Sequence, residues 1–155
     1  MEGRLVKGQI GVIGGAECSP EIYEIAREVG REIAKNGFSL ICGGLGGVME
    51  AACRGAKEIG GITIGLLPTT NKRDANPYCD IVLPTGLGHA RNILVVQASD
   101  GLIAVDGETG TLSEIAIALK VGKPIVGIKT WDLEERVPLA EGGRASVALL
   151  LGMLR

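Results

Sequence analysis

The stretch "GLIAVDGETGTLSEIAIALK", residues 101–120, carries the clearest sign of the fold. Five consecutive apolar-rich residues, 101–105, are followed by a turn of glycine and threonine and then by a segment with helical spacing, 111–123. A continuous apolar run bounded by a turn is typical of a strand that is buried on both faces. The stretch therefore predicts a strand that leads directly into a helix, the repeating unit of a parallel sheet.

The same unit recurs along the chain. Strands are expected at 9–15, 38–44, 62–68, 80–86, 101–106 and 124–129, and helices at 19–37, 46–61, 87–99, 111–123 and 144–154. This alternation predicts an α/β fold: a Rossmann-like, doubly wound parallel sheet in a three-layer αβα arrangement, forming a single domain over residues 1–155. A loop at 130–143 either covers a site or lies at a subunit contact. In such folds, ligands bind beyond the carboxyl ends of the strands, at the switch point of the sheet.

Composition limits the classes of partner. Of 155 residues, 46% are hydrophobic and 22% are charged, which predicts a packed core. The net charge is −2 without a basic cluster, so neither nucleic acid nor an anionic membrane is an expected partner. No apolar run approaches the roughly 20 residues that span a bilayer, and the N-terminal stretch lacks the pattern of a signal peptide. We therefore expect a cytoplasmic protein.

The four cysteines, Cys18, Cys42, Cys53 and Cys79, form no C-x-x-C pair and have no partnering histidines. This spacing is a poor zinc pattern, so no metal site is expected. Cys42 and Cys53 fall within apolar patterns, where a thiol is usually a small core residue.

Three of the expected strands end in glycine-rich turns. Because the carboxyl ends of parallel strands share one edge of a sheet, these turns should meet there. Each turn leads into a helix N-terminus, where free N–H groups and the positive end of the helix dipole favour an anion. The candidate phosphate-binding residues are Gly14, Gly15 and Ser19 from the first turn, Gly43, Gly44, Gly46 and Gly47 from the second, and Gly107, Thr109, Gly110 and Thr111 from the third. Ser19 is also a candidate helix cap.

Two common nucleotide motifs are absent. The first turn, "GVIGGAECS" (11–19), does not match G-x-G-x-x-G, and the second expected strand ends in Cys42 rather than an acidic residue. The P-loop motif is missing because the Gly122-Lys123 pair is followed by Pro124. NAD binding and P-loop ATPase chemistry are therefore disfavoured.

Two segments resemble a known family. The segment "CGGLGGVMEAACRGAKEIGGITIGLLP" (42–68) is similar to the G-G-G-x-G-x-M segment and following strand of the LOG (Lonely Guy) proteins, long misnamed lysine decarboxylases. The segment "ARNILVVQASDGLIAVDGETGTLSEIAIAL" (90–119) resembles their R-K-x-x-M … P-G-G-x-G-T-x-x-E segment. The resemblance spans about residues 8–129 and is strongest to the branch that contains the molybdenum cofactor carrier protein.

The resemblance implies a homodimer or homotetramer that binds a phosphate-bearing small molecule, with no required cofactor. The carrier branch binds the phosphate-bearing pterin of the molybdenum cofactor, so molybdenum cofactor or a nucleotide is the expected ligand. LOG enzymes instead hydrolyse the N-glycosidic bond of cytokinin ribotides, releasing base and ribose 5-monophosphate. Their essential arginine and glutamate fall on Arg91 and Glu114. The alternative is therefore a nucleoside 5′-monophosphate phosphoribohydrolase, not a lysine decarboxylase. A ligand-sensing or oligomeric scaffold without turnover is a third interpretation.

The chain departs from the LOG pattern at two places. Asp106, Gly107 and Glu108 stand where LOG enzymes have Pro-Gly-Gly, and Asn92 replaces the lysine that follows the arginine. Two extra carboxylates would repel a phosphate, because a pair of like unit charges about 4 Å apart costs on the order of 4 kcal/mol at an effective dielectric constant near 20.

Glu114 has a second interpretation. Thr111-Leu112-Ser113-Glu114 fits the S/T-x-x-E capping box, in which the glutamate bonds the helix start. A carboxylate near an anomeric carbon could alternatively stabilise an oxocarbenium-like transition state or activate water. The residues alone are consistent with both roles.

Overall fold

The computed structural model describes residues 3–133 and 135–154. Residue 134 of the expected loop 130–143 and the outermost residues of the expected 1–155 domain lie outside this description. The strands are β1 (Gln9–Gly14), β2 (Ser39–Cys42), β3 (Thr63–Leu67), β4 (Ile81–Pro84), β5 (Gly101–Val105) and β6 (Ile125–Ile128). The helices are α1 (Pro20–Lys35), α2 (Gly47–Glu58), α3 (Arg91–Ala98), α4 (Thr109–Val121) and α5 (Gly143–Met153), with short 3-10 turns at Lys72–Asp74 and Gly88–Ala90.

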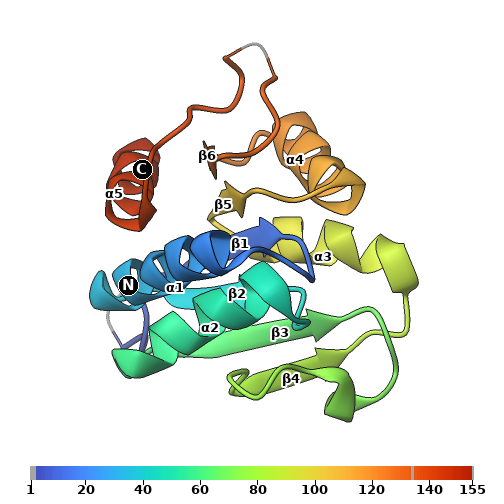
Figure 1. Ribbon diagram of the computed structural model, residues 1–155. Helices are drawn as coiled ribbons and strands as arrows, with labels where there is room; N and C mark the ends of the chain where they lie inside the picture. The colour runs from blue at the N-terminus through green and yellow to red at the C-terminus, as the bar shows by residue number, and fades with distance from the viewer. Residues whose placement is uncertain (1–2, 134, 155) are drawn as a thin grey trace.

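The strands form one parallel sheet in the order β4-β3-β2-β1-β5-β6 (Figure 1). The chain builds the sheet outward from β1 to β4, then returns across it to add β5 and β6 on the other side of β1. The switch point therefore lies between β1 and β5. The predicted α/β class with a doubly wound parallel sheet is confirmed.

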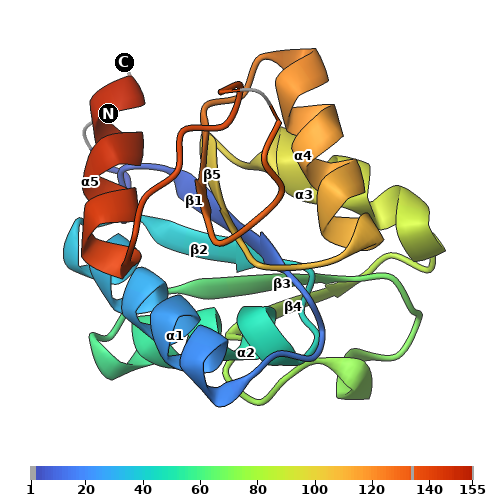
Figure 2. The ribbon, with the colours of Figure 1, turned by 45° about the horizontal axis from the view of Figure 1, so that its top comes forward.

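Helices cover both faces of the sheet (Figures 1 and 2). Helices α1, α2 and α5 pack on one face, and α3 and α4 pack on the other. All five residues of β5 are buried, as the continuous apolar run predicted. Val105 faces the α1–α2–α5 layer, whereas Ala104 faces the α3–α4 layer, so the strand supplies both halves of the core. The three-layer arrangement follows from this two-sided burial.

The two predicted helix starts had different outcomes. Ser19 caps α1, because its Oγ accepts a hydrogen bond from the Ile22 N–H at 3.2 Å. The capping box at 111–114 is wrong: α4 begins at Thr109, with Glu108 at the N-cap and no side-chain cap bond. Thr111 consequently lies inside the first turn of the helix and cannot cap it.

The turn before α4 explains this early start. Asp106 and Gly107 both have positive φ angles, 50° and 93°, so the chain reverses within two residues of β5. A Cβ atom at Gly107 would overlap the Thr111 side chain, so the turn requires glycine there. The tight reversal frees Thr109 to begin the helix, and Glu114 is available for another role.

Along the described parts of the chain, no helix is long and apolar enough to cross a membrane.

Candidate functional site

A pocket of about 450 Å³ opens at the carboxyl ends of β1 and β5, beside the switch point. Residues from the first and third glycine turns line it together with residues from α3 and α4. The members of the predicted set on its wall are Gly14, Gly15, Arg91, Gly107, Thr109, Gly110, Thr111 and Glu114. The fold therefore brings together residues that lie up to 100 positions apart in the sequence.

The remaining predicted residues, Ser19, Gly43, Gly44, Gly46 and Gly47, do not line the pocket. Leu45 of the second turn and Met49 of the following helix α2 line the pocket instead. Two amides in this region are already engaged: Gly44 N–H donates to Cys42 Sγ at 3.3 Å, and Val48 N–H donates to Gly15 O at 3.0 Å. The second turn and the start of α2 thus form one wall of the pocket, and the Val48 hydrogen bond connects this wall to the first turn. The amides of Gly44 and Val48 are therefore not free to bind an anion.

Arg91 stands at the start of α3 and is only 8% exposed. Its buried Nε has no hydrogen-bond partner among the residues that the structure describes. Burial lowers the pKa of the guanidinium, and the charges of Glu114 and Cys42 oppose that shift. A buried N–H donor without an acceptor is costly, so the pocket presents a cationic donor that an anionic ligand atom could satisfy.

The sheet makes room for Arg91 at Gly43. A Cβ atom at this position would collide with Arg91 Nη1 and would lie 2.8 Å from Met49 Sδ. Gly43 therefore acts through the arginine: its missing side chain lets the guanidinium approach the backbone at the end of β2.

Glu114 lies on α4 and is 7% exposed. Burial raises its pKa to about 7, and the nearby charge of Arg91 partly offsets this effect. The carboxyl group is therefore partly protonated near neutral pH. A group poised in this way can donate or accept a proton, which is what general acid–base chemistry requires.

The third turn is held from outside by the beginning of the loop 130–143. Thr130 Oγ1 donates to Asp106 O at 2.7 Å, and Trp131 Nε1 donates to Glu108 O at 3.1 Å. These bonds fix the backbone of the turn that carries the pocket. Thr130 and Trp131, at the beginning of the loop, therefore help to hold this wall of the pocket in place.

Several pocket residues were not predicted from the sequence. Glu17, His89 and Asn92 line the wall, and Asn92 Nδ2 donates to Ser113 Oγ at 3.1 Å. Ser113 Oγ in turn donates to Gly110 O at 2.7 Å, so Asn92 links α3 to the third turn. The position of Asn92 directly after Arg91 was the one available signal for its role. Glu17 and His89 belong to no motif that would have singled them out.

The pocket is acidic at its mouth. Glu17, Asp106 and Glu108 line it in addition to Glu114, and among the described residues Arg91 supplies the one guanidinium on its wall. The carboxylates that replace the LOG Pro-Gly-Gly segment therefore belong to the pocket wall, and any ligand must be compatible with them.

The fold defines a Rossmann-like protein with a pocket at the switch point of its sheet. The chain belongs to the SLOG cluster4 family, whose model matches residues 7–148.

Two similar solved structures are both of proteins named for the molybdenum cofactor. One is a molybdenum cofactor binding protein from the phototrophic bacterium Rippkaea orientalis, with a TM-score of 0.91 and 36% identity, covering 98% of this chain and 100% of that one. The other is the molybdenum cofactor carrier protein of Chlamydomonas reinhardtii, with a TM-score of 0.86 and 36% identity, covering 96% and 99%.

A cytokinin riboside 5′-monophosphate phosphoribohydrolase of Mycobacterium tuberculosis is 34% identical over 121 residues. The match covers 72% of this chain and 64% of that protein. The resemblance to LOG proteins and to the molybdenum cofactor carrier branch is therefore confirmed.

Proposed function

We propose that the protein binds a phosphate-bearing pterin, as a molybdenum cofactor carrier does, with Arg91 receiving an anionic oxygen of the ligand. The observation that carries this proposal is the buried Arg91 Nε, which has no partner in the described structure and belongs to a residue that lines a pocket of about 450 Å³. That volume falls in the range of roughly 300–1,000 Å³ typical of small-molecule sites. A guanidinium can bind a phosphate through two parallel hydrogen bonds.

The start of α4 supplies the second half of the anion site. Thr109 and Gly110 open this helix, and their position at its N-terminus favours negative charge. Because the helix has no side-chain cap, its first N–H groups are not occupied by a capping oxygen. We place the anionic group of the ligand between these groups and Arg91.

The acidic mouth favours a pterin over an adenine nucleotide. The side-chain carboxylates of Asp106 and Glu108 would repel a phosphate in contact with them, so the anion belongs at the backbone N–H groups of the helix start and at Arg91. A carboxylate can instead accept two parallel hydrogen bonds from the adjacent amino and ring N–H groups of a pterin. Adenine has no such pair of neighbouring donors. The ligand orientation that suits this wall has the anion at Arg91 and the pterin edge toward Asp106 and Glu108.

Binding is tested by calorimetry and native mass spectrometry under anaerobic conditions, with molybdenum cofactor, AMP and ribose 5-phosphate as separate ligands. We expect one molybdenum cofactor per chain, bound more tightly than AMP. Binding of none of the three ligands would contradict the proposal and would favour a scaffold without a small-molecule ligand.

A second candidate function is phosphoribohydrolase activity. It is favoured by Glu114, whose pKa of about 7 and proximity to the charge of Arg91 suit proton transfer at an N-glycosidic bond. The test is release of free base from AMP and from cytokinin ribotides. Base release by the wild type and its loss in Glu114→Gln would establish the enzyme; no release at any pH from 5 to 8 would exclude it for these substrates.

Assembly into a homodimer or homotetramer remains part of the proposal. Leu87, Ile93 and Leu94, at and just before α3, have side chains that are 39–52% exposed. Exposed apolar side chains on and just before one helix suit a contact between two copies of the chain. Light scattering after size-exclusion chromatography would give the oligomer mass, and a monomeric mass would contradict this part of the proposal.

A further inference from the structure

A cluster of three thiols lies beneath the second glycine turn, outside the pocket. Cys42 ends β2, Cys53 lies in α2, and Cys79 precedes β4. Their three Sγ atoms all lie within 4.8 Å of one another, and the Cys42 and Cys53 sulfurs are 3.5 Å apart. We propose that this three-thiol cluster is a binding site for one Cu(I) ion in trigonal thiolate coordination.

The spacing fits three bonds to one ion. Metal–thiolate bonds of about 2.3 Å place the sulfurs of a planar trigonal site roughly 4 Å apart. The distances in the cluster, from 3.5 Å to at most 4.8 Å, bracket this value. The sulfurs therefore need to move by only a fraction of an ångström to hold an ion between them.

The surroundings select a soft, three-coordinate ion. The group contains no fourth Cys, His, Asp or Glu among the residues of the described ranges. The neighbouring carboxylate of Asp80 is engaged, because its Oδ2 accepts hydrogen bonds from Lys57 Nζ at 2.9 Å and Thr63 N–H at 3.1 Å. Thiolates favour Cu(I) and zinc, but a structural zinc site is almost always four-coordinate. Three sulfurs without a fourth ligand thus match Cu(I) better.

The protein holds the three sulfurs from several sides. Gly44 N–H donates to Cys42 Sγ at 3.3 Å, which orients this sulfur. A Cβ atom at Gly65 would come within 2.8 Å of Cys79 Sγ, so the glycine leaves the space that this sulfur occupies. Metal ligands held in place by outer hydrogen bonds and packing are typical of built sites.

Charge and access are also suitable. Cys42 and Cys53 are fully buried, whereas Cys79 is partly exposed and offers an entry path. Binding of Cu(I) forms three Cu–S bonds and releases the thiol protons to solvent. The guanidinium of Arg91, which interacts electrostatically with Cys42, offsets part of the resulting negative charge.

The test uses the full, reduced chain under argon, titrated with Cu(I) in the presence of bathocuproine disulfonate as a competing chelator. We expect one Cu(I) per chain, and X-ray absorption should show three sulfur neighbours at about 2.3 Å. Cys79→Ser should weaken binding by more than the roughly 10–100-fold that loss of an outer-shell partner costs. Cys53→Ala, which replaces a buried thiol with a group of similar size, should have the same effect.

Cys18→Ser is the matched control, because Cys18 is a free thiol outside the cluster. It should bind Cu(I) as the wild type does. The proposal is overturned if Cys79→Ser and Cys53→Ala, shown to be folded by circular dichroism, retain wild-type affinity, or if Cys18→Ser loses it. It is equally overturned if fewer than three sulfurs surround the ion, or if the protein takes up Zn(II) while leaving Cu(I) with the chelator.

Discussion

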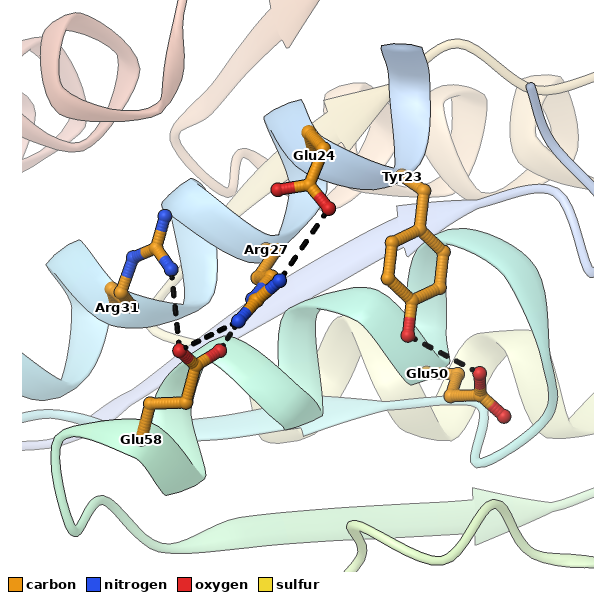
Figure 3. Close-up of polar contacts among 6 residues, drawn as sticks. All are labelled: Tyr23, Glu24, Arg27, Arg31, Glu50 and Glu58. Carbon is orange, nitrogen blue, oxygen red and sulfur yellow. Dashed lines mark hydrogen bonds and ion pairs between the residues drawn. The ribbon is translucent and has the colours of Figure 1, made fainter. Parts of the chain in front are cut away.

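Arg27 and Arg91 show two opposite environments for the same side chain. On the outer surface of α1 and α2, Arg27 Nη2 donates to Glu58 Oε2 at 2.9 Å, and Glu58 also accepts from Arg31 at 3.3 Å (Figure 3). Glu58 raises the pKa of Arg27. Arg91 is buried at the pocket, its Nε has no acceptor in the described structure, and burial lowers its pKa.

The comparison of the two arginines distinguishes an interaction that affects only stability from one that a ligand would complete. An exposed ion pair adds little, because water would solvate both charges in its absence. A buried donor without an acceptor costs free energy in the unliganded protein. The cost at Arg91 is explained if a ligand supplies the missing acceptor. The variants below test this contrast, from the largest expected effect to the smallest.

Replacing Arg91 with alanine should have the largest effect, and it should act on ligand binding. Truncating one partner of a buried charge pair costs about 2–5 kcal/mol, so affinity for molybdenum cofactor should fall at least about 30-fold by calorimetry. The Tm of the unliganded protein should change little, because the buried Nε has no acceptor to lose and Arg91 interacts with Glu114 through charge alone. Arg91→Lys is the control that keeps the charge without the planar fork, and its affinity should be intermediate. A large loss of Tm with unchanged affinity would reverse the interpretation of Arg91.

Glu114→Gln should change how stability depends on pH. Burial raises the pKa of the folded carboxyl to about 7, above the ordinary value of 4.5 that it has in the unfolded chain. The folded state therefore binds more protons in this interval, and wild-type stability should fall as pH rises from 4.5 to 7. The glutamine variant lacks this penalty, so at pH 8 it should be more stable than the wild type by up to about 3 kcal/mol, with little difference at pH 4.

Urea unfolding at both pH values measures this difference. Glu108→Gln is the matched control, since Glu108 lines the same pocket but is exposed. Its stability should follow the wild type at both pH values. An equal offset between Glu114→Gln and the wild type at pH 4 and pH 8 would show that Glu114 titrates normally.

Gly43→Ala should damage the site through Arg91. The added Cβ would meet the guanidinium, and overpacking of this kind costs about 1–3 kcal/mol. We expect a lower Tm and about tenfold weaker binding of molybdenum cofactor. In the double variant with Arg91→Ala, the stability loss should largely disappear, because the colliding group is gone. An undiminished loss in the double variant would assign the effect to Met49 or the backbone instead.

Arg27→Ala should have the smallest effect. Removal of its exposed pair with Glu58 should lower the Tm by at most about 2–4 °C, and this difference should shrink in high salt. Binding of molybdenum cofactor should not change. A decrease in affinity comparable to that of Arg91→Ala would contradict the division between the two arginines.

Local pattern was sufficient for the fold but not for every helix start. The apolar run 101–105 predicted a buried strand because periodicity depends on neighbouring residues, and Ser19 was predicted as a cap for the same reason. The capping box at 111–114 was wrong because Asp106 adopts a positive φ angle, which a non-glycine residue seldom does and which no pattern signalled. That turn moved the helix start by two residues.

The burial of the site residues could not be predicted from local sequence, because it depends on contacts between distant segments. Arg91 would by itself be expected at the surface, and its burial depends on the missing side chain of Gly43 across the sheet. The resemblance to LOG proteins was what singled it out. The three-thiol cluster had no local pattern at all, because residues 42, 53 and 79 meet only after β2, α2 and the segment before β4 have packed together.

The most direct test of the central claim is a crystal structure of the protein with bound molybdenum cofactor. We predict an anionic oxygen of the ligand within hydrogen-bond distance of Arg91 Nε, and the pterin edge facing Asp106 and Glu108. A cofactor bound elsewhere, or bound in this pocket with Arg91 Nε still lacking an acceptor, would contradict the account.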